Sequence, residues 1–156
     1  MSVETVKEYL KKWNKADDVK EFDQSSATVE LAATALGVAP QRIAKTLSFL
    51  TKEGCMLLVA AGDARIDNAK FKETFGQKAK MLPKEQVEEL TGHPVGGVCP
   101  FAGKEGLPIY LDESLKRFTS VFPAAGSASS AVEMTCEELY QCSGAISFVD
   151  VCKTDV

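Results

Sequence analysis

Apolar residues recur every three or four positions near the start of the chain, at Val3, Val6, Leu10 and Trp13. This spacing predicts an amphipathic helix over residues 2–15. Residues that favour helix starts and ends predict further helices over 28–36, 67–75, 83–90 and 135–142, and a helical turn over 113–118. Apolar runs between turn residues predict strands over 18–23, 42–50, 55–61, 78–82, 107–112, 119–123, 131–134 and 146–151. Helices interspersed with strands, some of them joined by hairpins, predict an α/β fold with a mixed sheet. At 156 residues we expect a single domain over 1–156.

Lys45 stands in the middle of a strand face that is otherwise apolar. Alternate residues of a strand share a face, so Lys45 lies with Ile43, Leu47 and Phe49. A lysine is costly to bury unless it has a partner. The face therefore either lines a pocket or belongs to an edge strand that Lys45 protects against aggregation. Glu133, which alternates with apolar neighbours, is either a surface residue or the partner of Lys45.

The composition, with 45% hydrophobic and 26% charged residues, is that of an ordinary globular protein. No apolar run reaches the roughly 18 residues of a membrane span, and the polar N-terminus lacks the apolar centre of a signal peptide. We therefore expect no membrane segment and a cytoplasmic location. The net charge of −4 argues against a broad nonspecific nucleic-acid binder, but it allows local contact with an acidic ligand through a few lysines. With five cysteines, no CxxC pair and a single histidine, we expect neither a metal site nor a cofactor.

Two loops rich in small residues carry the candidate chemistry. The first contains the run Gly96-Gly97-Val98-Cys99-Pro100-Phe101. It is neither a phosphate-binding loop nor a dinucleotide fingerprint. Adjacent glycines let main-chain amides approach a carbonyl oxygen or an oxyanion, and Phe101 would supply an apolar wall. The second loop, residues 124–130, holds hydroxyls that suit a polar ligand, although plain turns would explain both loops equally well.

Cys99 and His93 raise a different chemistry, because a thiol and an imidazole in one loop can form a nucleophile and its base. No signature of a known cysteine hydrolase surrounds them, and no orienting Asn or Asp is evident. We therefore expect both to be structural.

Taken together, these segments resemble one family. Lys45-Thr46-Leu47, the run from Gly96 to Phe101, the segment 110–115, and Ala125-Gly126 followed by Val132-Glu133-Met134 occur in the order and spacing of the YbaK/ProX family. That family comprises free-standing aminoacyl-tRNA deacylases and the editing insertion domain of bacterial prolyl-tRNA synthetase. The resemblance covers nearly the whole chain. It implies a mixed, partly barrel-like sheet surrounded by helices.

The resemblance also implies a reaction, which is hydrolysis of the ester between a small amino acid (Ala, Ser, Thr or Cys) and the 3′ end of a mischarged tRNA, typically tRNA-Pro. Lys45 falls on the catalytic lysine of the family, and Gly96 and Pro100 fall on its Gly-x-x-x-Pro loop. No protein nucleophile, metal or cofactor is implied, because positioning and oxyanion stabilisation would supply the rate. The partners implied are an aminoacyl-tRNA and, as a candidate, a prolyl-tRNA synthetase. The expected substrate-binding residues are Phe22, Thr46, Gly96, Gly97, Val98, Cys99, Pro100, Phe101, Gly126, Ser127, Ser129 and Ser130.

Two departures bear on the substrate. Phe22 and Ala131 stand where cysteine-specific members carry Tyr and Asp, so two polar groups of a cysteine pocket are absent. Two other functions stay open at this point. One is a non-catalytic module that binds an aminoacyl-tRNA or a protein partner, and the other is a thiol hydrolase that uses Cys99 and His93.

Overall fold

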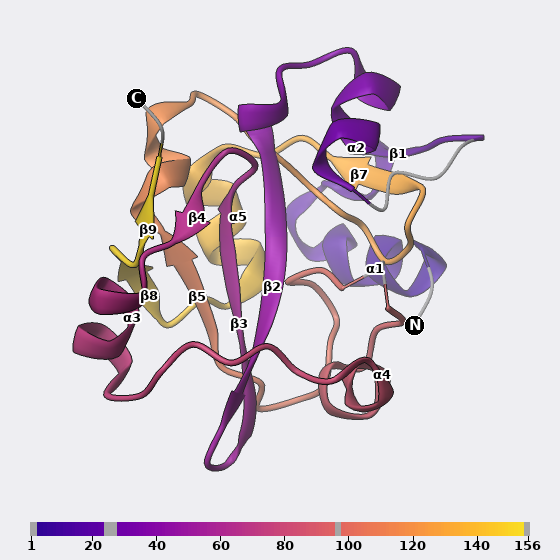
Figure 1. Ribbon diagram of the computed structural model, residues 1–156. Helices are drawn as coiled ribbons and strands as arrows, with labels where there is room; N and C mark the ends of the chain where they lie inside the picture. The colour runs from indigo at the N-terminus through magenta and orange to yellow at the C-terminus, as the bar shows by residue number, and fades with distance from the viewer. Residues whose placement is uncertain (1–2, 24–27, 96–97, 155–156) are drawn as a thin grey trace.

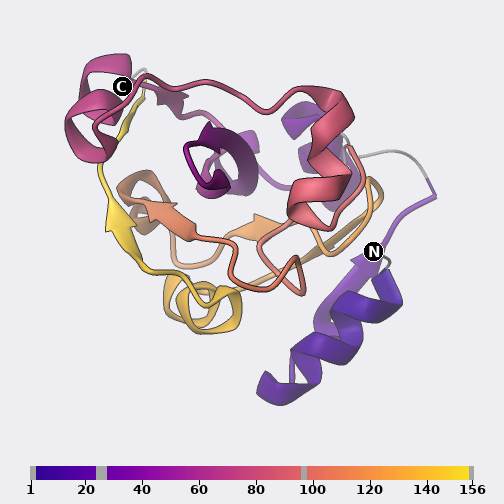
Figure 2. The same cartoon turned by 90° about the horizontal axis from the view of Figure 1, so that it is seen from below.

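A five-stranded mixed sheet forms the centre of the computed structural model, which describes residues 3–23, 28–95 and 98–154 (Figure 1). Its strands, in spatial order, are β6 (Phe122–Pro123), β2 (Ile43–Thr51), β3 (Gly54–Ala61), β5 (Ile109–Asp112) and β8 (Ser147–Val149). The β2–β3 hairpin is antiparallel, and the other three neighbouring pairs are parallel. The sheet curls within the ring of surrounding elements seen in Figure 2. This confirms the mixed, partly barrel-like α/β fold expected from the sequence.

Two small antiparallel pairs flank the central sheet. They are β1 (Val19–Glu21) with β7 (Ser130–Val132), and β4 (Arg65–Ile66) with β9 (Cys152–Lys153). In Figure 1 the first pair lies to the right of β2 and the second to the left of β3. The β1–β7 pair brings the serine-rich loop that precedes β7 to the same side of the sheet as the outer edge of β2.

Three of the described helices begin at the polar caps that their sequences predict, whereas the helix expected over 2–15 ends at Leu10 and the one expected from Pro83 begins at Lys84. The described helices are α1 (Val3–Leu10), α2 (Val29–Leu36), α3 (Asn68–Phe75), α4 (Lys84–Thr91) and α5 (Cys136–Ser143), with 3₁₀ turns η1 (Lys11–Trp13), η2 (Ala16–Asp18), η3 (Pro40–Arg42) and η4 (Glu113–Arg117). Thr135 and Glu138 form a reciprocal capping box at the start of α5. Thr28 accepts a hydrogen bond from the Leu31 N–H and so caps α2, which lies beside β2.

The core is built around β3, whose apolar run is buried on both faces. Residues 57–61 of this strand are completely buried, as expected for a strand with a neighbour on each side and with packing above and below. Phe49 of β2 packs against Phe71 of α3 with tilted rings and 4.9 Å between ring centroids, which fixes that helix on the sheet. Because β3 is fixed in the core, its partner β2 presents its other edge to the surrounding elements.

Five strand predictions were too long, among them the strand expected over 18–23, which shrinks to β1, and two short strands were missed. The strand expected over 78–82 is reduced to one bridge between Met81 and Phe49, because Pro83 cannot continue a ladder and the chain turns into α4. The strands expected over 107–112, 119–123 and 146–151 shrink to β5, β6 and β8. The short pair β4–β9 was not predicted, because a strand of two residues has no readable periodicity.

Candidate active site

Lys45 reaches across the end of the hairpin and is held by main-chain oxygens. Its Nζ donates to the carbonyl of Gly62 at 3.4 Å and to the carbonyl of Ala64, both in the turn between β3 and β4. The side chain is half-buried, and burial lowers the pKa of Lys45 from its ordinary 10.5. Two carbonyl acceptors leave one of the three N–H groups of an ammonium for another partner. The partner considered from sequence, Glu133, instead accepts from Arg42 (3.3 Å) and Ser120 (2.5 Å).

Glycine is the only residue type that fits position 62, in the turn that holds Lys45. A Cβ added to Gly62 would lie 2.1 Å from the Pro40 carbonyl oxygen and 2.8 Å from Val29 Cγ1. The close approach of this turn to η3 and α2 therefore requires glycine. Gly62 and Ala64 were not predicted as site residues, because carbonyl ligands leave no mark in side-chain patterns. The one sequence feature that could have indicated Gly62 was a glycine at the end of a buried strand, which often marks a close approach of the main chain.

Lys45, Thr46, Val98 and Ser130 line a single cavity of about 180 Å³ at the outer edge of β2. These four candidates come from three separate segments of the sequence, and the fold brings them together. The remaining wall is mostly apolar, and apart from Ile43 and Ala131 its residues were not anticipated. It consists of Thr28, Val29 and Ala32 of α2 and its cap, with Ile43, Ala44, Phe122, Ala124 and Ala131. The face of Lys45 therefore lines a pocket, which was the first of the two interpretations of this lysine.

Thr46, which lines this cavity, carries an unsatisfied hydroxyl. Its Oγ1 is buried and has no hydrogen-bond partner among the described residues. Buried hydroxyls in native proteins are nearly always paired, so an orphan marks a place where a ligand group can bind.

Among the described residues, no strand covers the outer side of the main chain at Thr46. β6 pairs with β2 only at Ile43 and Ala44. Farther along, the Ser48 carbonyl accepts from Leu82 (3.1 Å) and the Leu50 N–H donates to Lys80 (2.7 Å). Even-numbered residues of β2 thus direct their N–H and C=O groups to the outer edge. No strand in the described ranges pairs with β2 at Thr46, so its main-chain groups face the cavity side unpaired.

The second candidate loop is organised by its own serines. Ser127 Oγ donates to Ser130 Oγ at 2.9 Å and accepts from the Ser129 N–H at 3.2 Å. The Phe22 N–H donates to the Ser129 carbonyl at 2.8 Å, which ties the end of β1 to this loop. Gly126 is buried and has a φ of 101°, a conformation that favours glycine. Of these residues only Ser130 lines the Lys45 cavity.

The Cys99–Phe101 run is interior rather than displayed. Cys99, Pro100 and Phe101 are buried, and Cys99 and Pro100 instead border a separate cavity near α1. Cys99 Sγ lies 3.7 Å from His93 Nε2, but both residues are fully buried. Burial raises the pKa of Cys99 to about 12 and lowers the pKa of His93, so the pair is a neutral thiol beside a neutral imidazole. This geometry argues against the thiol hydrolase. Gly96 and Gly97, the other part of this prediction, lie outside the described residues.

The sequence profile of the aminoacyl-tRNA editing domain matches residues 23–142, which include β2, the first loop and the serine loop. The chain belongs to the aminoacyl-tRNA editing domain family. The Lys45 cavity is thus a feature of an editing domain, and the family resemblance expected from the sequence is confirmed.

Individual proteins with similar sequences or structures include proline–tRNA ligases and a candidate trans-editing enzyme. The uncharacterized protein YwhH of Bacillus subtilis is 52% identical, with 98% of each chain covered. The proline–tRNA ligase of Maridesulfovibrio salexigens is 36% identical over 68% of this chain but only 18% of the ligase. A solved structure described as a candidate trans-editing enzyme for prolyl tRNA synthetase superposes with a TM-score of 0.86, at 31% identity over 97% of this chain and 96% of the other.

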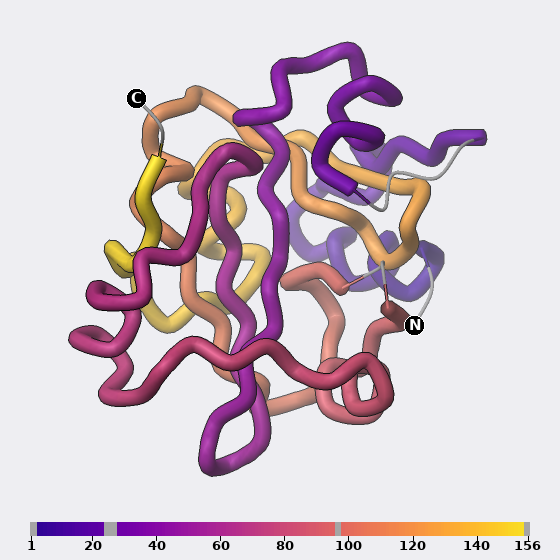
Figure 3. Tube along the Cα trace, in the orientation of Figure 1, coloured from indigo at the N-terminus to yellow at the C-terminus, as the bar shows by residue number. Residues whose placement is uncertain are grey.

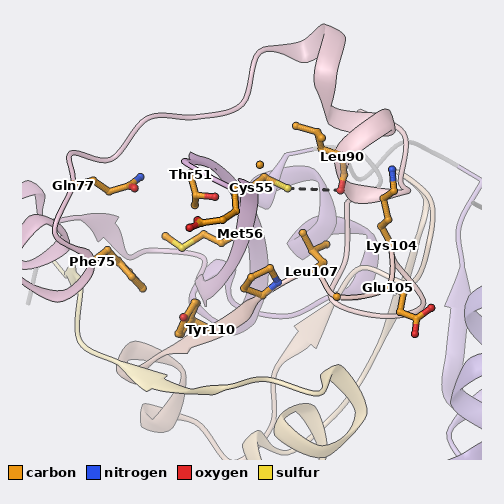
Figure 4. Close-up of a pocket in the computed structure, with 14 residues that line it drawn as sticks. Thr51, Cys55, Met56, Phe75, Gln77, Leu90, Lys104, Glu105, Leu107 and Tyr110 are labelled. Carbon is orange, nitrogen blue, oxygen red and sulfur yellow. Dashed lines mark hydrogen bonds between the residues drawn. The ribbon is translucent and has the colours of Figure 1, made fainter.

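A larger cavity, of about 590 Å³, lies at the opposite end of the hairpin (Figure 4). Phe75 and Tyr110 meet edge to face on one side of it, and Cys55 donates to the Leu90 carbonyl (3.7 Å) on another. Gln77 is already engaged with the Leu50 carbonyl at 2.7 Å. None of the residues predicted as catalytic or substrate-binding lines this cavity. The Lys45 cavity, although smaller, is the one in which the candidate chemistry converges.

Proposed function

We propose that this editing domain is a free-standing deacylase, which hydrolyses the ester between a small amino acid and the 3′ end of a mischarged tRNA. One observation carries the proposal: in a member of the aminoacyl-tRNA editing family, a held lysine and an orphan buried hydroxyl share one small cavity. In this proposal Lys45 is the catalytic residue, and Thr46, Val98 and Ser130 contact the aminoacyl end.

The chemistry requires positioning more than a nucleophile. A water oxygen attacks the ester carbonyl carbon, and the resulting oxyanion needs hydrogen-bond donors. The free N–H of Lys45 and the uncovered N–H of Thr46 are such donors, and both are fixed before the reaction by the turn at Gly62 and by β2. When the intermediate collapses, the ribose oxygen leaves with a proton, which yields the free amino acid and a tRNA with an intact 3′ hydroxyl. Fixed donors lower the barrier because no reorganisation is needed during the step.

The volume of the cavity supports a small amino acid. About 180 Å³ is only several times the roughly 30 Å³ share of a liquid water molecule. The apolar wall formed by α2, Ile43 and Phe122 suits a short side chain, and the hydroxyls of Thr46 and Ser130 suit its polar groups. Size alone separates small side chains poorly, so Ala, Ser, Thr and Cys all remain in the proposed substrate set.

The proposal extends to the setting of the reaction. Residues 1–156 would act as one editing domain, in the cytoplasm where tRNAs are charged. The substrate would be tRNA-Pro, either free or delivered by a prolyl-tRNA synthetase. Support for this comes from the relatives, whose names include proline–tRNA ligases and a candidate trans-editing enzyme for prolyl tRNA synthetase. No helix in the described part of the chain is long and apolar enough to cross a membrane.

The test is deacylation by the purified protein of tRNA-Pro charged in turn with Ala, Ser, Thr, Cys and Pro, measured with the Lys45→Ala variant in parallel. We expect hydrolysis of at least one mischarged species and not of Pro-tRNA, with a loss of at least about 100-fold in Lys45→Ala, or about 2.8 kcal/mol of barrier. Circular dichroism of the variant controls for folding. A stoichiometric complex without turnover would favour the non-catalytic binding module instead, and full activity in Lys45→Ala would overturn the role of the lysine.

A further inference from the structure

The connection between α3 and α4, together with the first residue of α4, holds three lysines and no carboxylate before Glu85. Residues 76–84 contain Lys78, Lys80 and Lys84 and no acidic residue, in a chain whose net charge is −4. All three lysines are exposed, and none is paired with a carboxylate of the described residues. Unlike Lys70, which pairs with Asp150 at 3.1 Å, these lysines are available to an anionic partner.

The 76–84 segment lies along the same edge of β2 as the cavity. It crosses β2 before entering α4, as Figures 1 and 3 show. The Leu50 N–H donates to Lys80, and the Leu82 N–H donates to Ser48, so the segment runs antiparallel to β2. Its course from Lys80 to Leu82 is therefore directed toward the uncovered position at Thr46, and Lys84 follows two residues later.

The distance from the lysines to the cavity suits a nucleic acid strand. Lys80 lies level with Leu50, which is five residues along β2 from Lys45. At about 3.3 Å per residue of strand, the separation along β2 is roughly 17 Å. This is the span of a few nucleotides, so a strand whose terminal aminoacyl group occupies the cavity would bring its preceding phosphates to these lysines.

Three exposed apolar side chains belong to the 76–84 segment or to segments that contribute other residues to the cavity wall. Met81 is 51% exposed between Lys80 and Leu82, and Val95, in the loop that leads toward Val98, is 55% exposed. Leu31 of α2, the helix that walls the cavity, is 47% exposed. Unstacked bases of a single strand offer flat apolar surfaces that such side chains can contact. A partner bound through charge alone would not use these apolar side chains. The combination favours a single-stranded nucleic acid.

We propose that the 76–84 segment binds the phosphates of the single-stranded 3′ end of an RNA, with Lys80 and Lys84 as principal contacts and the terminal aminoacyl ester at the Lys45 cavity. The proposal rests on the proposed deacylase function and adds to it the surface that holds the polynucleotide. Phosphate contacts would position the strand without reading its sequence. This local surface accounts for how a protein with net negative charge engages RNA.

The experiment compares two substrates that carry the same ester. One is the aminoacyl-tRNA, and the other is the 3′-aminoacyl adenosine, which has the terminal nucleoside but no phosphate. The variant is Lys80→Gln/Lys84→Gln. Its matched control is Lys72→Gln/Lys153→Gln, which removes the same charge from exposed lysines on α3 and β9, on the other side of β2 in Figure 1.

We expect KM for the aminoacyl-tRNA to rise at least about fivefold at low salt in the Lys80/Lys84 variant, with little change in kcat. The slope of log KM against log salt should fall by about 1.4, because each phosphate of a single strand that a lysine neutralises contributes about 0.7 to that slope. Hydrolysis of the aminoacyl adenosine should stay within about twofold of wild type in both variants.

Equal behaviour of the Lys80/Lys84 variant and its control on the aminoacyl-tRNA would overturn the inference while leaving the deacylase proposal intact. A parallel loss on the aminoacyl adenosine would also overturn it, because the lysines would then act through the cavity rather than through phosphates. Failure of the wild type on both substrates would instead count against the proposed function itself.

Discussion

Replacing Thr46 by valine should make the protein more stable and less active. The hydroxyl is buried and has no partner in the described structure, and such a group costs about 1–3 kcal/mol. Valine has nearly the same shape and suits a strand, so it removes this cost without leaving a void. We expect a gain of about 1 kcal/mol in the free energy of unfolding, which for a domain of this size raises Tm by about 2–4 °C.

The same substitution should weaken the reaction. A hydrogen bond from the hydroxyl to a substrate group is worth about 0.5–1.5 kcal/mol, and up to about 3 kcal/mol if that group is charged. Since each 1.4 kcal/mol is a factor of about ten, kcat/KM should fall by roughly 2- to 12-fold, and by up to roughly 140-fold if the group is charged. The assays are thermal unfolding and single-turnover deacylation on the same preparation, with Thr46→Ser expected to restore most of the activity.

Thr91→Val is the matched control, because Thr91 carries a buried hydroxyl that is satisfied. It donates to the Val87 carbonyl at 2.7 Å and accepts from the His93 N–H at 3.1 Å. Valine there strands the His93 N–H and should cost about 1–3 kcal/mol of stability. Opposite signs of the stability change at the two threonines are the decisive result. A Thr46→Val protein that is destabilised and fully active would refute the reasoning, since the hydroxyl would then be structural.

Three further predictions concern the turn that holds Lys45 and the buried pair of Cys99 and His93. Gly62→Ala should lower both Tm and kcat, because the new Cβ at 2.1 Å from the Pro40 carbonyl oxygen must displace the turn that holds Lys45; an unchanged Tm and kcat would contradict the tight packing. Cys99→Ser should keep deacylation activity. In the wild type, mass mapping should find Cys99 unmodified after treatment of the native protein with iodoacetamide at pH 8, because burial raises its pKa to about 12. Loss of activity in the variant together with rapid alkylation of Cys99 would instead support the thiol hydrolase. Burial lowers the pKa of His93, the one histidine of the chain, below its ordinary 6.5. As the pH falls from about 6.5 toward the folded-state pKa, the unfolded state therefore binds more protons than the folded state, and the free energy of unfolding decreases in that window. Urea unfolding at pH 7.5 and 5.5 should show this loss in the wild type and a smaller loss in His93→Gln, and equal losses would place the titration elsewhere.

Many helix ends and the main hairpin could be predicted from the sequence, because each depends on a few neighbouring residues. The cap at Thr135, the glycine ends of the helices and the hairpin at Lys52–Gly54 each depend on a few neighbouring residues, and the structure has them as predicted. The strand expected over 78–82 failed because its pairing depends on what lies beside it. The segment pairs with β2 through the bridge between Met81 and Phe49 and then turns into α4 at Pro83.

The candidate site likewise has features that the sequence could predict and features that it could not. The sequence by itself determined that Lys45 is unusual, since a lysine within an apolar strand face is visible in the pattern, and its motifs determined the family. It could not show that Lys45 is held by the carbonyls of Gly62 and Ala64, because main-chain oxygens are the same in every residue. Nor could it separate Ser130, which lines the cavity, from Ser127 and Ser129, which do not. Only tertiary structure decided these points, because a cavity is made where distant segments fail to fill space, and that depends on the packing of the whole chain.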